Sequence, residues 1–440
     1  MKTMLLPKEI QTRIFMANDE TKEVFGKNVY YGWFILATSF YLLFIGYGMR
    51  HTFGIFFKPL LAEFQLDRAT LSLAFSINLL AYGFTQPLAG RLSDRFGAKF
   101  VILGSVLLTA VSMFFLHYAS TLWHLYLLYG LMGIGNSGTA FVTHVGLISR
   151  WFPARKATAL AIANTGASIG QLVLVPLSMV LILNYDWRTA YLILAVSLLL
   201  TAVPPILLVL RRGRAEASKA TVNEPAQVLM RRAKPFTLNH WSEAFKTVPF
   251  WQLAGSYFAC GYTVTTITVH LASYVTDQGY SAMTAARVLA ITGGVNVFGI
   301  LIIGALADRF TRKNPLALTY FIRGLAYFLL IYVESLWGIY FFSVLIGLSL
   351  LATIPPTSAL TGDFFGRENV GSLFGFITLC HQMGSALSSY TGGKLFDLTS
   401  SYQLTFLISG LLCMAATLCC LTIRERRMVQ SPPEVAVAAP

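Results

Sequence analysis

The chain has 440 residues, of which 55% are hydrophobic and only 12% are charged. Soluble domains carry about 25% charged residues, so this composition excludes a water-soluble globular protein. The formal net charge of +14 does not indicate a nucleic-acid partner, because Lys and Arg lie mainly in short polar gaps between apolar runs. Every second gap is the basic one, which is typical of the cytoplasmic loops of membrane proteins.

The apolar runs follow one another along the whole chain, each of the roughly 18–25 residues that cross a bilayer as an α-helix. Hydropathy predicts about twelve spans, at residues 31–56, 70–90, 100–118, 122–148, 157–182, 188–210, 249–275, 283–307, 315–333, 336–358, 370–392 and 402–422. The predicted fold class is therefore an all-α membrane protein with about 12 transmembrane helices. An even number of spans places both termini on one side, which the basic loops identify as the cytoplasm.

The longest polar stretch, Arg211–Lys246, follows the sixth span and divides the chain into two halves of about six spans each. The N-terminal segment lacks the pattern of a signal peptide, and the end of the chain has the composition of a disordered tail. The predicted domains are a cytoplasmic lead-in (1–28), a first six-helix bundle (29–210), a cytoplasmic linker (211–248), a second six-helix bundle (249–423) and a cytoplasmic tail (424–440).

A charged decapeptide occurs once in each half, always after the second span. It reads GRLSDRFGAK at Gly90–Lys99 and GALADRFTRK at Gly304–Lys313. Internal repeats of this kind build many transporters, which bind substrate where the repeats meet and expose the site to alternate sides of the membrane. The repetition therefore predicts transport by alternating access.

The pattern G-x-L-x-D-R-x-G-x-K, with its echo in the second half, resembles the signature loop of the major facilitator superfamily. The resemblance covers essentially the whole chain and implies a fold of two pseudo-symmetric six-helix bundles. Within that superfamily, three stretches are similar to the branch of monocarboxylate transporters and oxalate/formate antiporters. They are YYGW with the first span that follows it, SRWFPARKATALAIANTGASIG at Ser149–Gly170, and TVPFWQLA at the start of the seventh span.

In this family the charged loop is thought to latch one half against the other on the cytoplasmic side. The resemblance implies that Asp94 meets the start of span eleven, at Asn369–Gly371, and that Asp308 meets the start of span five, near Arg155–Ala157. A helix N-terminus favours such an anion, although the charges would also suit a role in topology alone. Because Thr311 replaces Gly97 in the second copy, we expect Asp94 to matter more than Asp308. The latch residues implied are Gly90, Asp94, Arg95, Gly97, Asp308, Arg309 and Arg155.

Ionisable side chains inside spans are costly and usually functional. Arg50 and His51 lie in span one, and His270 lies at a similar depth in span seven, its equivalent in the second half. They predict a site for an anion, with histidine as a proton carrier, although snorkelling to the outer headgroups is the alternative. The candidate substrate-binding residues are Arg50, His51, Asn136, Tyr262, His270, Asn296, His381 and Gln382.

One position departs from the monocarboxylate branch. That branch usually carries an arginine in span eight, four residues before the glycine of the second loop, and this chain has Ile300 there. The departure weakens the case for a lactate-like substrate, unless Arg50 or Arg323 substitutes for the missing arginine.

The chain has no Walker loop, G-x-S-x-G sequence or metal-spaced histidine cluster, so we expect no enzyme activity, cofactor or metal. We expect a secondary transporter that moves a small, monocarboxylate-like organic anion together with a proton. Its other expected partners are the surrounding membrane lipids. The alternatives are a transporter of a larger or neutral metabolite, such as a heteroaromatic compound or vitamin, and a transporter-like sensor. The predicted location is a bacterial-type inner membrane, with the protein as a monomer and no nucleic-acid partner.

Overall fold

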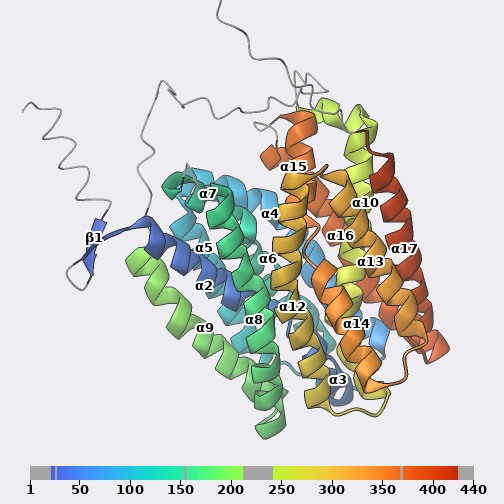
Figure 1. The fold of residues 1–440 in the computed structure, drawn as a ribbon. Helices are drawn as coiled ribbons and strands as arrows, with labels where there is room; N and C mark the ends of the chain where they lie inside the picture. The colour runs from blue at the N-terminus through green and yellow to red at the C-terminus, as the bar shows by residue number, and fades with distance from the viewer. Residues whose placement is uncertain (1–20, 25–26, 153–155, 212–240, 367–369, 425–440) are drawn as a thin grey trace, which may run out of the picture. The chain divides into compact units, whose positions relative to one another are not determined.

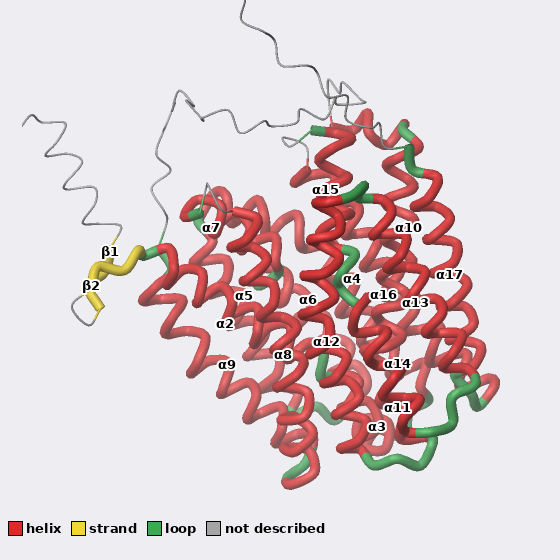
Figure 2. The backbone as a smooth tube through the Cα atoms, in the orientation of Figure 1, coloured by secondary structure: helices red, strands yellow, loops and turns green. Residues whose placement is uncertain are grey.

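The computed structural model describes residues 21–24, 27–152, 156–211, 241–366 and 370–424. Nearly all of these residues are helical (Figure 2). The strands in this part of the chain are β1 (Thr21–Val24) and β2 (Lys27–Tyr30), which pair antiparallel. Most of the predicted linker and tail lies outside the described residues.

The described residues of the first half form eight helices (Figure 1). They are α2 (Gly32–Arg50), α3 (Phe53–Phe64), α4 (Arg68–Phe96), α5 (Ala98–Leu116), α6 (Leu122–Gly138), α7 (Phe141–Trp151), α8 (Lys156–Asn184) and α9 (Trp187–Val209). Three of these helices, α4, α6 and α9, have a polar N-cap residue. Asp67, Thr121 and Asp186 each accept a hydrogen bond from a backbone N–H in the first turn.

The second half begins with a short 3₁₀ turn, η1 (Trp241–Lys246). It continues with α10 (Val248–Thr265), a π-helical turn η2 (Thr266–His270), α11 (Leu271–Asp277), α12 (Ala282–Arg309), α13 (Lys313–Ile331), α14 (Leu336–Ser349), α15 (Ile354–Phe365), α16 (Val370–Thr399) and α17 (Gln403–Thr422). Joined across their short breaks, the helices of both halves form twelve rods at the predicted spans. Among the described residues, 8 segments are long and apolar enough by themselves to cross a membrane.

Four of the rods are broken, and they are the first and fourth of each half: α2/α3, α6/α7, α10/α11 and α14/α15. A broken helix leaves carbonyl groups without their usual N–H partners, and inside a membrane the protein itself must supply others. At three breaks a threonine hydroxyl donates to a carbonyl of the preceding turn: Thr52 to Met49 at 2.7 Å, Thr139 to Asn136 at 3.1 Å and Thr266 to Tyr262 at 3.1 Å.

The chain divides into two compact units. One unit comprises residues 1–214 and 268–297, and the other comprises residues 215–267 and 298–440. Each unit contains helices in very close contact. A methyl group on Gly170 would lie 2.0 Å from the carbonyl oxygen of Phe44, between α8 and α2, and one on Gly261 would lie 1.9 Å from that of His381, between α10 and α16. Only glycine permits helices to approach this closely.

Candidate functional site

Arg50 and His51 lie at the break between α2 and α3, inside the first unit. The Arg50 guanidinium carbon is 4.1 Å from the centre of the Tyr82 ring on α4, and the Tyr82 hydroxyl lies 3.3 Å from that of Tyr47. The His51 ring is 6.5 Å from the Tyr47 ring and is only 8% exposed. A cation held against an aromatic face and two hydroxyl groups at a helix break is suited to bind an anion. Tyr47 and Tyr82 were not among the residues predicted from sequence.

His270 and Asn296 come from the second half of the sequence but belong to the first compact unit. His270 is fully buried at the end of the π-helical turn, with its ring 5.8 Å from the ring of Phe57 on α3. The Asn296 amide donates to the Ser168 hydroxyl of α8 at 2.7 Å. Both predicted residues therefore join segment 268–297 to helices of the first half.

Gln171 strengthens the same contact between α8 and α12. Its side-chain amide is buried and donates to the carbonyl of Leu289 at 3.0 Å. A methyl group on Gly293 would lie 2.8 Å from the Gln171 side chain, so the two helices pack tightly at this level.

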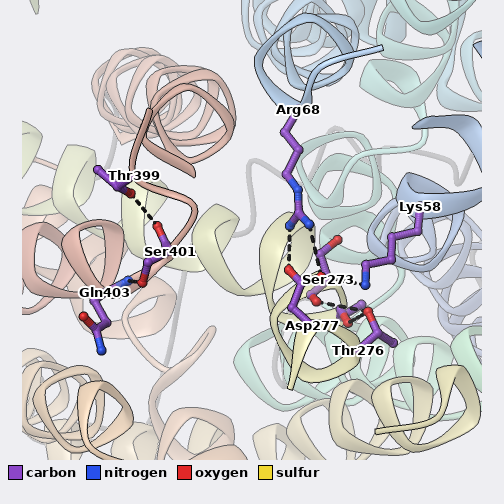
Figure 3. A network of polar contacts seen from close by, with 9 residues as sticks. Lys58, Arg68, Ser273, Thr276, Asp277, Thr399, Ser401 and Gln403 are labelled. Atoms are coloured by element: carbon purple, nitrogen blue, oxygen red, sulfur yellow. Dashed lines mark hydrogen bonds and ion pairs between the residues drawn. The ribbon is translucent and has the colours of Figure 1, made fainter. Parts of the chain in front are cut away.

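Asp277, at the last turn of α11, forms ion pairs with two cations of the first half (Figure 3). Its carboxylate oxygens lie 2.7 Å from the Lys58 ammonium and 2.8 and 3.1 Å from two nitrogens of Arg68. An acid at a helix C-terminus is disfavoured by the helix dipole, and the two cations offset that cost. Because α4 runs from Arg68 to the first decapeptide, this cluster lies at the opposite end of the helix from that loop.

His381 and Gln382 lie on α16 in the second unit. The His381 Nδ1 is 3.4 Å from both the Gln382 amide nitrogen and the Ser385 hydroxyl, and its ring is 4.8 Å from the Tyr257 ring. The predicted pair thus forms a polar cluster between α16 and α10.

Tyr262 lies on the same pair of helices but points elsewhere. Its hydroxyl is 2.9 Å from that of Thr391, nearly three turns beyond His381 on α16. The structure therefore places Tyr262 and His381 at separate levels of one helix contact.

Arg323 is the largest of the fully buried side chains, at 1% exposure. Its guanidinium donates to the Cys260 sulfur and the Thr263 hydroxyl, both at 3.2 Å, to the Leu350 carbonyl at 2.8 Å, and to the carbonyl and hydroxyl of Ser349. A guanidinium has five N–H donors, and these contacts use them all. Arg323 therefore fixes the fourth helix break, between α14 and α15, and has no donor left for a carboxylate.

Asn136 faces α5 within the first unit. Its side-chain oxygen is 3.4 Å from the Thr109 hydroxyl, and both residues line an internal pocket of about 10 Å³. A space of that size holds about one water molecule. This pocket is too small for an organic substrate.

The predicted latch lies partly outside the described residues. Arg155 and Asn369 fall outside them, and the structure does not describe the side chains of Asp94 and Asp308. Gly90 has open space around it, since a methyl group there would meet no atom within 4 Å.

The two basic residues of the latch have matching environments in the two copies. The Arg95 guanidinium carbon lies 5.2 Å from the centre of the Phe96 ring, and that of Arg309 lies 5.8 Å from the Phe310 ring. The repeat thus preserves a local side-chain arrangement as well as a sequence.

Gly97 and Thr311 differ in backbone conformation. Gly97 has φ 96° and ψ 143°, a region open almost only to glycine, whereas Thr311 is not among the residues with positive φ. The second copy, which has Thr311 in place of Gly97, therefore has a different backbone conformation at this position.

The final lysine of each decapeptide has a role that the sequence did not suggest. Lys99 donates to the carbonyl of Leu207 at 2.7 Å, and Lys313 donates to those of Leu421 and Ile423 at 2.9 and 2.7 Å. The acceptors lie at the C-terminal ends of α9 and α17, the last helix of each half. A cation is favourable there because it meets both the open carbonyls and the negative end of the helix dipole.

Within the described residues, no three His, Cys, Asp or Glu side chains come together as a metal site would require. The groups around Arg50 and His381 are instead aromatic, amide and hydroxyl groups. Such groups suit the reversible binding of a small molecule.

Comparison with known proteins identifies the family. The family model described as the Major Facilitator Superfamily matches residues 36–336 and 295–440. The chain is 30% identical to the MFS-type transporter YcxA of Bacillus subtilis (strain 168) over 382 residues, 84% of this chain and 90% of that protein. It is 26% identical to monocarboxylate transporter 13 of Bos taurus over 393 residues, 88% of each chain.

The fold is also similar to those of solved transporter structures. A bacterial homologue of the human lysosomal transporter Spinster, in an inward-facing and occupied conformation, superposes with a TM-score of 0.70 at 16% identity, over 89% of this chain and 96% of that one. The predicted fold class and the resemblance to the monocarboxylate transporter branch are thus confirmed. The chain is a membrane transporter, and not an enzyme, that belongs to the Major Facilitator Superfamily.

Proposed function

We propose that the protein is a secondary transporter of a small, monocarboxylate-like organic anion. It works by alternating access with a co-transported proton, in a bacterial-type inner membrane with both termini in the cytoplasm. The observation that carries this proposal is the Arg50 guanidinium at the α2/α3 break, 4.1 Å from the Tyr82 ring. The names of the related monocarboxylate transporters support the same class of substrate.

Arg50 is the better candidate for the role of the missing span-eight arginine. Ile300 at that position is apolar and 4% exposed, and Arg323 has all its donors occupied by protein groups. His270 and His381 are the proton carriers in this proposal, since histidines inside membrane spans commonly act in proton relays.

The proposal is tested by uptake into proteoliposomes over a panel of monocarboxylates, dicarboxylates and neutral heteroaromatic compounds, with and without an inward proton gradient. We expect one carboxylate class to be accumulated, and Arg50→Gln to lower its uptake about 10-fold or more, as the loss of a charge-assisted contact does. Arg287→Gln, which removes an exposed cation of α12, is the control and should transport normally.

Two results would contradict the proposal. If Arg50→Gln transports a carboxylate at the rate of the Arg287→Gln control, then Arg50 does not bind the anion. If neutral compounds are accumulated and carboxylates neither enter nor compete, the protein belongs with transporters of larger or neutral metabolites, which the apolar Ile300 favours.

The ion pairs of Asp277 join the first half of the sequence to the second, and in this proposal they break and reform in each cycle. Partly exposed ion pairs contribute about 1 kcal/mol, so Asp277→Asn should shift the open and closed populations at this end by roughly fivefold. We expect uptake by the parent protein to change between 0.1 and 0.5 M salt, where screening increases, and uptake by Asp277→Asn to be much less sensitive.

Glu63→Gln is the matched control for that experiment. Glu63 pairs with Arg188 at 2.9 Å, but both residues belong to the first half of the chain, so this pair need not break during transport. Equal salt dependence in Asp277→Asn, Glu63→Gln and the parent would exclude Asp277 from the cycle.

A further inference from the structure

A second pocket lies beside the first decapeptide, away from Arg50 and His51. It encloses about 290 Å³ and is formed by the decapeptide loop, α7 and the chain that follows α9. Its walls include Phe96, Lys99, Phe100, Arg150, Leu210 and Arg211. The pocket therefore lies on the loop that the sequence repeats.

Three of the lining residues are cations, and no acidic side chain is among the residues that line it. Lys99 is partly buried, whereas Arg150 and Arg211 are exposed, with Arg211 5.1 Å from the Tyr31 ring. Even with a full negative charge on the adjacent Asp94, three cations would leave the pocket positive. The pocket also includes Ala98, the first residue of α5, where the N–H groups of a helix have no partner within the helix. These features attract a phosphate group.

Large apolar side chains surround the pocket on the outside of the unit. Of the lining residues, Phe96 is 53% exposed and Phe100 65%. In a membrane protein such residues face lipid tails, and the cations beside them mark the level of the headgroups. A ligand that fills this pocket must therefore present a phosphate to the cations and hydrocarbon to the phenylalanines.

The second copy of the loop carries different charges. Arg312, which takes the place of Ala98, forms an ion pair with Asp363 at 2.7 Å. An acid is thus built into the corresponding region of the second half, where it opposes the binding of an anion. We expect the phosphate site to be a property of the first copy.

We propose that this pocket binds the phosphate headgroup of an anionic phospholipid, which contacts Lys99, Arg150 and Arg211. The lipid binds beside the loop that the family resemblance implicates in the latch. The lipid composition of the membrane therefore affects the conformation of that loop. This site is separate from the substrate site, and the inference does not depend on which solute is transported.

The test measures lipid retention by the full-length protein. The protein is reconstituted in phosphatidylcholine nanodiscs with or without 30% phosphatidylglycerol, then extracted in mild detergent, and bound lipid is counted by native mass spectrometry. We expect phosphatidylglycerol to be retained selectively, and Arg150→Gln/Arg211→Gln to weaken retention about 30-fold, from about fivefold for each cation near a membrane surface. The matched control, Arg91→Gln/Arg424→Gln, removes two exposed cations outside the pocket and should retain the lipid.

A competition with inorganic phosphate separates the two sources of this chemistry. If millimolar phosphate does not displace phosphatidylglycerol from the parent protein, the lipid is the ligand, as proposed. If phosphate displaces it fully, or if the pocket variant retains the lipid as well as the control does, the proposal is overturned. Both double variants must melt within a few degrees of the parent protein. If Arg150→Gln/Arg211→Gln does not, the single variant Arg150→Gln is used in its place.

Discussion

Replacement of Arg323 by methionine is expected to destabilise the protein by about 3–5 kcal/mol, the largest effect of any single substitution considered for this chain. Arg323 is buried and donates to a thiol, two hydroxyls and two carbonyls. Removing the guanidinium takes these donors from the buried carbonyls of Ser349 and Leu350, and each unpaired acceptor costs about 1–3 kcal/mol.

The measurement is the melting temperature of the purified protein in detergent, together with the yield of monodisperse protein. Arg323→Lys should fall between the parent and Arg323→Met, because lysine keeps the charge but has fewer donors. Arg287→Met, an exposed arginine on α12, should melt like the parent. If Arg323→Met also melts like the parent, then the guanidinium does not hold the α14/α15 break together.

Replacement of Gly54 by alanine should reduce transport about 10-fold or more while leaving the protein folded. The added methyl group would lie 2.4 Å from the carbonyl oxygen of Thr268 and 3.3 Å from that of Val269. Backbone atoms cannot yield as a flexible side chain can, and overpacking of this kind costs about 1–3 kcal/mol. The cost is incurred only when segment 268–297 packs against α3, so the substitution favours the state in which they are apart.

Two measurements check this prediction. Uptake into proteoliposomes should fall, and a cysteine placed at the buried Ser273 of α11 should react faster with a maleimide than it does with Gly54 intact. Gly104→Ala is the control, because a methyl group on Gly104 meets no atom within 4 Å. Unchanged labelling at position 273, with normal uptake, would contradict the proposed role of the Gly54 contact.

The twelve rods were predictable because hydrophobic length is a property of the local sequence. The positions of most breaks were not. Proline marks the α14/α15 break, where Pro355 and Pro356 lie in the first turn of α15, but α4 continues through Pro87 and α8 through Pro176. The first rod breaks instead at His51 and Thr52, where a threonine hydroxyl compensates an open carbonyl. A membrane helix tolerates proline when its neighbours satisfy the freed groups, so the location of a break depends on tertiary packing.

The candidate site was predictable only in part, for a related reason. Arg50, His51 and His270 were found because ionisable groups in apolar segments are rare. Asp277 was missed because it lies outside the apolar part of its span, and its partner Arg68 is 209 residues away. Tyr82 was missed because tyrosines are frequent in this chain, and only its distance from Arg50 distinguishes it from the others.

The lysine bonds at the ends of α9 and α17 bear on how the protein is assembled. Lys99 holds the end of the last helix of the first half, and Lys313 does so in the second, with 108 residues separating each lysine from its acceptor at Leu207 or Leu421. Each half therefore secures its own final helix without using the segment that joins them. A chain cut within residues 212–240 would keep both of these bonds, so neither anchor requires the first and second halves to be one continuous polypeptide.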